Sequence, residues 1–385
     1  MDTLENTNGL DLLSKAKRVI IKLGSALLIN EDGKVNATRI HAISRDVVKL
    51  ITEGKQVALV SSGAVALGRD ALGLSSKSLK LEEKQAAAAA GQLRLMRAWQ
   101  DAFQEHNIPV AQALLTIDDT ETRRRWLNAR ATLNTLLEAG AVPIVNENDT
   151  VATEEIRYGD NDRLAARVSQ MIGADVLVLL SDIDGLYTAD PRFNDQAKHI
   201  PVVTSLSADI LAMGGDANAD SGVGSGGMAT KLEAARIAMT AGCATLIARG
   251  DPTDNPTDQP IEAILNGGRS TWFIPPVTPE TARKQWLLGA IKPSGKIYVD
   301  EGAAIALSKH KSLLHAGVTK VSGQFSRGDG VEILGPDNKP IARGICAYSS
   351  DDALKLIGCK SSEIESIVGF KGRPALIHID DMVTI

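Results

Sequence analysis

The chain has 385 residues, which at roughly 150 residues per domain favours two or three domains. Its 44% hydrophobic and 23% charged residues exclude an intrinsically disordered chain. The formal net charge of −5 argues against a protein whose main task is to coat nucleic acid or an anionic membrane, because both partners are negative.

The first part of the chain alternates between strand and helix patterns. Residues 1–14 contain no apolar core segment, so we expect a short disordered tail rather than a secretory signal. Residues 15–275 alternate short β-branched runs with helical spacings, which predicts an α/β domain with a mainly parallel open sheet sandwiched by helices. The predicted strands are 18–23, 56–61, 109–115, 141–145, 175–180 and 244–248, and the predicted helices are a segment from Asn36 to Gly54, 81–106, 121–139, 162–172 and 228–241.

The composition changes after residue 250. Proline-rich turns predict a linker at 276–293, and the shorter strand patterns of 294–385 predict a small, separate β-rich domain. The three cysteines are far apart and show no Cys-x-x-Cys spacing, so we expect reduced thiols in a cytoplasmic protein. No apolar run approaches the length of a membrane span.

Two lysines lie in settings that suit phosphate. Lys22 ends the first predicted strand and is followed by Gly24 and Ser25, so its ammonium group can point at a phosphate that the turn amides also approach. Lys231 falls in the first turn of a helix that follows the glycine-rich residues 222–227, where it opposes the helix dipole and favours an anionic partner. The chain contains no P-loop sequence.

Small and polar residues follow other predicted strands, where ligands of open α/β sheets bind. Residues 61–68 place amides and hydroxyls at a helix N-terminus, which suits a carboxylate or a phosphate. Asn-Glu-Asn-Asp at 146–149 and Gly-Asp-Asn-Asp at 159–162 exceed what helix capping needs, which favours binding of an amino group and fixing of lysine heads. Ser181 and Asp182 follow a further buried strand.

None of the six histidines lies in these loops. A carboxylate that accepts a phosphoryl group is already ionised at pH 7 and needs no general base. Two lysines, an amide-rich loop and Mg²⁺ would therefore suffice for phosphoryl transfer by positioning and charge neutralisation.

These residues together resemble the amino acid kinase family over about 270 residues. The resemblance implies transfer of a phosphoryl group from ATP, with Mg²⁺, to the γ-carboxylate of L-glutamate, giving the L-glutamyl 5-phosphate that begins proline biosynthesis. The matching motifs are Lys22–Ser25, Ser61–Ala64, Asn146–Asp149, Gly159–Asp162, Gly185–Pro191 and Gly226–Lys231.

The resemblance also implies the roles of individual residues. Lys22 and Lys231 contact the phosphates and stabilise the transferred group, and Asp162 orients both lysines. Asp149 suits the ammonium group of glutamate. No protein side chain is assigned to Mg²⁺, which is expected to bind through the ATP phosphates. The implied glutamate site is Ser62, Gly63, Ala64, Asp149 and Asn161, and the implied ATP site is Lys22, Ser181, Asp182, Ser225, Gly226, Gly227, Met228, Ala229, Thr230 and Lys231.

The C-terminal domain resembles a PUA domain through residues 299–304 and 323–329. This suggests an alternative, RNA binding, but Ser294 to Ile385 carry 11 basic and 11 acidic residues, so the basic surface typical of RNA binders is missing. A sibling kinase for another carboxylate, for carbamate or for a nucleotide stays open, as does an inactive regulator. Family membership further implies inhibition by proline, a homo-oligomer of two or four chains, and a possible glutamyl phosphate reductase partner, with no membrane partner.

Overall fold

The computed structural model describes residues 9–74, 79–151, 161–215, 227–251, 253, 255, 257–289 and 293–385. The chain divides into two compact units, Met1–Pro279 and Glu280–Ile385. None of the helices in the described ranges is both long enough and apolar enough to cross a bilayer.

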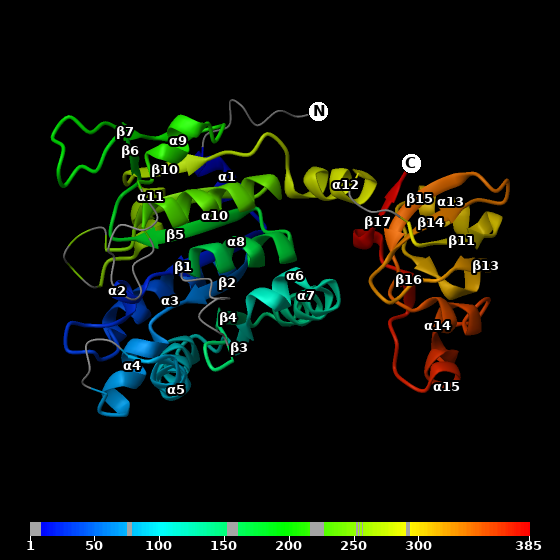
Figure 1. Cartoon of the computed structure of the whole chain (residues 1–385), viewed down its shortest axis with the longest axis horizontal. Coiled ribbons are helices and arrows are strands. Elements are labelled where there is room, and N and C mark those ends of the chain that lie inside the picture. The colour runs from blue at the N-terminus through cyan, green and yellow to red at the C-terminus, as the bar shows by residue number, and fades with distance from the viewer. Residues whose placement is uncertain are drawn as a thin grey trace. The chain divides into compact units, whose positions relative to one another are not determined.

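The N-terminal unit is built on one eight-stranded sheet (Figure 1). The six strands from β3 to β9 in the spatial order are parallel to one another, and β10 is antiparallel to β9. In spatial order the strands are β3 (Val110–Leu115), β4 (Val142–Glu147), β2 (Gln56–Ser61), β1 (Arg18–Leu23), β5 (Val176–Ser181), β9 (Ala244–Arg249), β10 (Ser270–Phe273) and β8 (Val202–Val203).

Helices cover both faces of this sheet, and side-chain alternation along the strands decides which face each residue meets. Ile21 and Leu59 pack on one face, whereas Ile20 and Val60 pack on the other. The predicted helix-sandwiched, mainly parallel α/β fold is therefore confirmed. The first face meets α1 (Gly9–Lys15), α3 (Ala37–Thr52), α5 (Leu81–Gln104) and α11 (Pro260–Leu265), and the second meets α7 (Arg123–Glu138), α8 (Asn161–Ile172) and α10 (Met228–Thr240).

Helix α3 shows how local sequence sets these elements. The Asn36 side chain accepts a hydrogen bond from the backbone N–H of Arg39 and caps the helix, as predicted. Gly54 takes a φ of 85° just after the helix ends. Shorter elements join the main ones: α2 (Ser25–Leu28), α4 (Ala64–Ala71), α6 (Ile117–Glu121), β6 (Leu186–Tyr187), β7 (His199–Ile200) and α9 (Ala208–Ala212).

Helices α4 and α5 approach each other unusually closely. A Cβ built on Gly68 of α4 would lie 1.6 Å from the carbonyl oxygen of Ala87, and one built on Gly91 of α5 would lie 1.8 Å from that of Ala64. Real Cβ contacts are never this short. The two backbones are therefore in direct contact, and both positions require glycine.

Three sequence-based predictions differ from the structure. Residues 9–14 belong to helix α1 instead of a disordered tail, because Leu13 is fully buried in the core; residues 1–8 lie outside the described part. The helix predicted at 121–139 is α7 (Arg123–Glu138), and the short helix α6 (Ile117–Glu121), which was not predicted, ends just before it because Thr122 has extended backbone angles. The segment 276–293, predicted as a linker, contains helix α12 (Pro279–Gly289).

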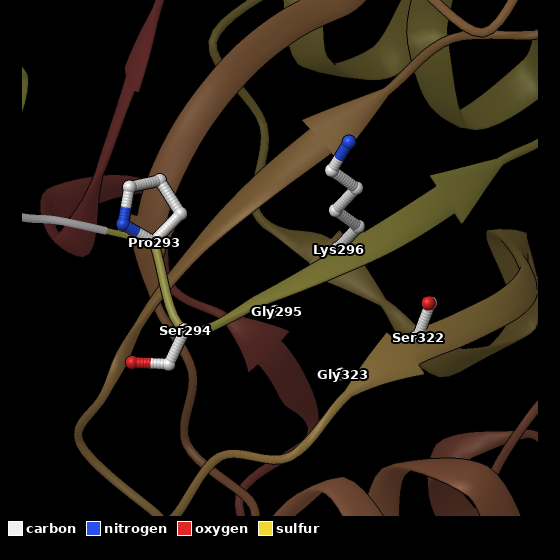
Figure 2. Close-up of a pocket in the computed structure, with 6 residues that line it drawn as sticks. All are labelled: Pro293, Ser294, Gly295, Lys296, Ser322 and Gly323. Atoms are coloured by element: carbon white, nitrogen blue, oxygen red, sulfur yellow. The ribbon is translucent and has the colours of Figure 1, made fainter.

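The C-terminal unit is β-rich, as predicted. Its five-stranded sheet has the order β13 (Val318–Gly323), β11 (Gly295–Val299), β14 (Gly330–Leu334), β15 (Pro340–Ile345) and β17 (Met382–Thr384), and β12 (Leu313–Leu314) pairs with β16 (Ala375–Ile377). Helices α13 (Glu301–Ser308), α14 (Ser350–Lys355) and α15 (Ile364–Val368) complete it. A shallow pocket in this unit carries a single charged side chain, Lys296 (Figure 2), and is lined by Pro293, Ser294, Gly295, Lys296, Ser322 and Gly323.

Candidate active site

The candidate site lies where the central parallel strands end. Leu23 of β1 is level with Ser61 of β2 on one side and with Leu180 of β5 on the other, so all three strands end at the same edge of the sheet. Helices α4, α8 and α10 begin after the loops at this edge. This is the edge at which open α/β sheets bind ligands.

A buried carboxylate links the two predicted lysines. Lys22 has the same orientation on β1 as Ile20, toward the face that α8 and α10 cover. Its Nζ lies 2.6 Å from Oδ1 of Asp162, and the Nζ of Lys231 lies 3.2 Å from Oδ2 of the same carboxylate. Asp162 is fully buried and each lysine is 4% exposed.

The charge balance of this trio indicates what it binds. Two ammonium groups around one carboxylate carry a combined formal charge of +1. Positive charge held in a buried setting is costly and favours a nearby anion. Thr230, next to Lys231, donates to the Gly227 carbonyl at 2.7 Å and lies 3.3 Å from Oδ2 of Asp162, so the start of α10 is fixed to the same carboxylate. The trio is thus suited to a phosphate group.

A second polar cluster surrounds the first residue of α8. Nδ2 of Asn161 lies 2.8 Å from Oγ of Ser62, 2.9 Å from Oδ1 of Asn146 and 3.1 Å from the carbonyl oxygen of Ser61. A side-chain amide has only two N–H groups, so these acceptors share them. Oδ1 of Asn146 also accepts from the backbone N–H of Glu147 at 2.9 Å, which fixes the orientation of the Asn146 amide.

The turn after β2 exposes the start of a helix to this cluster. Gly63 has a φ of 103°, which favours glycine, and its added Cβ would lie 2.7 Å from Cδ1 of Ile29. No side chain caps α4 at this residue. The first amides of α4, beginning at Ala64, therefore point toward the edge of the sheet and suit a carboxylate.

The structure brings several of the predicted residues together in two clusters. It joins Lys22, Lys231 and Asp162 in one cluster, and Ser62 and Asn161 in the other. Oγ of Ser181 donates to the exposed Asp182 carboxylate at 2.9 Å, and the half-buried Asp149 follows β4. Met228 and Ala229 begin α10. Ser225, Gly226 and residues 158–160 lie outside the described residues.

Sequence reasoning missed part of the second cluster. Asn146 was inside a motif, yet its role as the acceptor for Asn161 depends on strand register, which the sequence does not display. Ser61 lies in the Ser61–Ala64 motif but is not among the predicted site residues, and its partner Trp99, whose indole Nε1 donates to Ser61 Oγ at 3.2 Å, lies in no motif. The sequence signal available for Ser61 is a hydroxyl directly after the buried apolar run Val57–Val60.

The chain is similar to known proteins over most of its length. The chain matches the amino acid kinase family over residues 17–249 and the PUA domain over residues 295–368. It is 56% identical over 372 residues to the glutamate 5-kinase of Paramagnetospirillum magneticum, covering 96% of this chain and 98% of that protein. It is 55% identical over 368 residues to the glutamate 5-kinase of Caulobacter vibrioides, covering 95% of this chain and 96% of that protein.

Among solved structures the chain is similar to carbamate kinase from Giardia lamblia bound to AMP-PNP, with a TM-score of 0.47 at 17% identity over 68% of this chain and 99% of that one. The chain belongs to the amino acid kinase family, in its glutamate 5-kinase branch, and carries a C-terminal PUA domain.

Proposed function

We propose that this protein phosphorylates the γ-carboxylate of L-glutamate with ATP, forming L-glutamyl 5-phosphate for proline biosynthesis. One observation carries the proposal: two buried lysines converge on Asp162 at the carboxyl edge of the sheet, in a chain more than half identical to glutamate 5-kinases. An oxygen of the glutamate γ-carboxylate attacks the γ-phosphorus of ATP. The bond to the β,γ-bridging oxygen breaks, and ADP leaves with the electron pair.

The two lysines place positive charge where negative charge develops during phosphoryl transfer. In phosphoryl transfer, negative charge spreads over the equatorial and leaving oxygens, so preorganised cations stabilise the transition state more than the ground state. Lys22 and Lys231 approach from two different elements, β1 and α10. Asp162 holds both ammonium groups by direct contact and so limits their motion before ATP arrives.

Mg²⁺ fits this site as a companion of ATP. The ion keeps several waters and usually binds through substrate phosphates. The buried Asp162 carboxylate is already neutralised by two lysines, so it is a poor candidate ligand. Bound to the phosphates, the ion supplies further charge neutralisation.

Glutamate is assigned to the cluster around Asn161. Ser62 and Asn161 offer a hydroxyl and an amide, and the uncapped start of α4 at Gly63 and Ala64 offers amides to a carboxylate. Asp149 supplies a negative charge for the substrate ammonium group. ATP is assigned to the other side of the lysines, with Ser181, Asp182 and the start of α10 at Gly227–Lys231, together with Ser225 and Gly226.

A substrate panel tests this function. With ATP and Mg²⁺, the protein should release ADP when offered L-glutamate, and hydroxylamine should trap the acyl phosphate as γ-glutamyl hydroxamate. Aspartate, N-acetylglutamate and UMP serve as competing acceptors. Faster turnover with any of these three than with glutamate would overturn the substrate assignment.

Regulation, assembly and location are proposals that rest on family resemblance. They are inhibition by proline, assembly as a dimer or tetramer, and coupling to a glutamyl phosphate reductase. A cytoplasmic location is further supported by three free cysteines, Cys243, Cys346 and Cys359, because oxidising compartments favour paired ones.

A further inference from the structure

Trp99 forms a polar contact inside an otherwise apolar cluster. It lies on α5 between Leu95 and Phe103, and its ring centroid is 6.1 Å from that of Phe103. Its indole Nε1 donates to Oγ of Ser61 at 3.2 Å, and both residues are fully buried. Because a buried polar group without a partner is costly, this hydrogen bond constrains both side chains.

Ser61 connects this contact to the glutamate side of the candidate site. It is the last residue of β2, and its side chain shares the orientation of Leu59, toward α5. Its carbonyl oxygen accepts from Nδ2 of Asn161 at 3.1 Å, and the next residue, Ser62, accepts from the same amide at 2.8 Å. Trp99 is therefore hydrogen-bonded directly to Ser61, and Asn161 is hydrogen-bonded to both Ser61 and Ser62.

Helix α5 holds the far side of the same turn as well. Gly91, two helical turns before Trp99, lies against the carbonyl oxygen of Ala64, the first residue of α4. The turn at Ser62 and Gly63 is thus fixed at both ends by one helix. The cluster of Lys22, Lys231 and Asp162 lies on the opposite face of the sheet from Trp99, because Lys22 shares the orientation of Ile20.

We propose that Trp99 is a positioning residue for glutamate: its indole N–H fixes Ser61, and thereby the Ser62–Gly63 turn, for substrate binding. The inference rests on the proposed function, since it assigns glutamate to this turn. Because the contact lies on the face away from the lysines, its loss should weaken glutamate binding and leave the phosphoryl-transfer step almost unchanged.

Kinetics of the full-length protein test the proposal. Trp99→Phe keeps a ring and removes the N–H, and Ser61→Ala removes the acceptor. Each should raise the glutamate KM about three- to tenfold, with kcat and the ATP KM within about twofold of wild type. The double variant should be no worse than the single ones, because both remove the same hydrogen bond. Trp272→Phe is the matched control, since Trp272 lies in the same apolar cluster, and its glutamate KM should not change.

A spectroscopic measurement separates positioning from stability. In protein labelled with 5-fluorotryptophan, the ¹⁹F signal of Trp99 is identified by its loss in Trp99→Phe. Glutamate alone should shift this signal and leave that of Trp272 in place. Ser61→Ala keeps the proposal testable if Trp99→Phe does not fold, because it removes the same hydrogen bond from the other side.

The outcomes distinguish the two proposals. If the wild type turns over glutamate but both variants keep its KM, or the Trp99 signal does not respond to glutamate, the role of Trp99 is refuted and the proposed function stands. If the wild type does not phosphorylate glutamate, both proposals fail.

Discussion

Replacement of Lys231 by methionine tests the proposed chemistry most directly. Methionine is unbranched and similar in length, so it can fill the space of a lysine that is 4% exposed. Asp162 keeps Lys22 at 2.6 Å, so the buried carboxylate retains a cationic partner and the fold should survive. The formal charge of the trio falls from +1 to zero.

The expected effect is on kcat rather than on nucleotide affinity. A preorganised donor that meets charge developing in the transition state is typically worth about 3–4 kcal/mol, or roughly two to three decades in kcat. The ATP KM should rise much less, because the phosphates of bound ATP keep their contacts with Mg²⁺ and with the remaining protein groups before the reaction. Lys22→Met should behave in the same way, since both lysines face the same group.

Steady-state rates of ADP release at saturating glutamate measure this effect. Lys339→Met, at a lysine whose side chain is 81% exposed in the C-terminal unit, is the control and should keep the wild-type kcat. The wild-type pH–rate profile should be flat between about pH 6.5 and 8, because an ionised carboxylate needs no base. Near wild-type turnover in Lys231→Met, or a histidine-dependent limb near pH 6.5, would refute the two-lysine mechanism.

Four further predictions concern substrate, inhibition, domains and pH. Asp149→Asn should raise the glutamate KM tenfold or more, from loss of about 1.5–3 kcal/mol, with little change in the ATP KM; an unchanged glutamate KM removes Asp149 from the site. Proline shares the α-carboxylate and ammonium of glutamate, so millimolar proline should inhibit competitively, and a rate that is unaffected at sub-saturating glutamate contradicts this. Because the catalytic motifs lie in residues 15–275, a chain ending at Pro279 should keep kinase activity; a folded but inactive truncation disproves this assignment. Burial lowers the pKa of His315 to about 4, so as pH falls from about 6.5 the unfolded chain binds the proton first, and the free energy of unfolding of the C-terminal unit should drop by about 3 kcal/mol. Urea titrations of wild type and His315→Phe at pH 7 and 4.5 measure this, and an equal pH dependence in both proteins contradicts it.

The central strands of the sheet were predictable from the sequence, whereas the antiparallel strand β10 was not. Residues 18–23 and 56–61 match β1 and β2 because both are short, β-branched runs buried on both faces. Strand β10, residues 270–273, was missed because four residues give too short a pattern, and its antiparallel pairing with β9 is decided by tertiary contacts.

The candidate site divides in the same way. Lys22 could be singled out because it precedes a glycine turn, and Lys231 because it opposes the helix dipole in a first helical turn, whereas their common partner Asp162 came from family resemblance. The contacts among Asn161, Asn146 and Ser61 could not be predicted, because they depend on how far each strand extends past its neighbour. Side-chain identity indicates chemistry, but register decides which groups meet.

The glycine contacts between α4 and α5 limit how this protein can be engineered for stability. Replacing a helical glycine by alanine commonly stabilises a protein by about 0.4–1 kcal/mol, because it restricts the unfolded chain. A design method guided by helix propensity would therefore select Gly68 and Gly91 first. At both positions the new methyl group would press a carbonyl of the neighbouring helix, at Ala87 and Ala64 respectively. Because the carbonyl groups belong to the backbone, the overlap should cost more than the helix propensity gains, so Gly68→Ala and Gly91→Ala should lower the free energy of unfolding and displace the turn at Gly63.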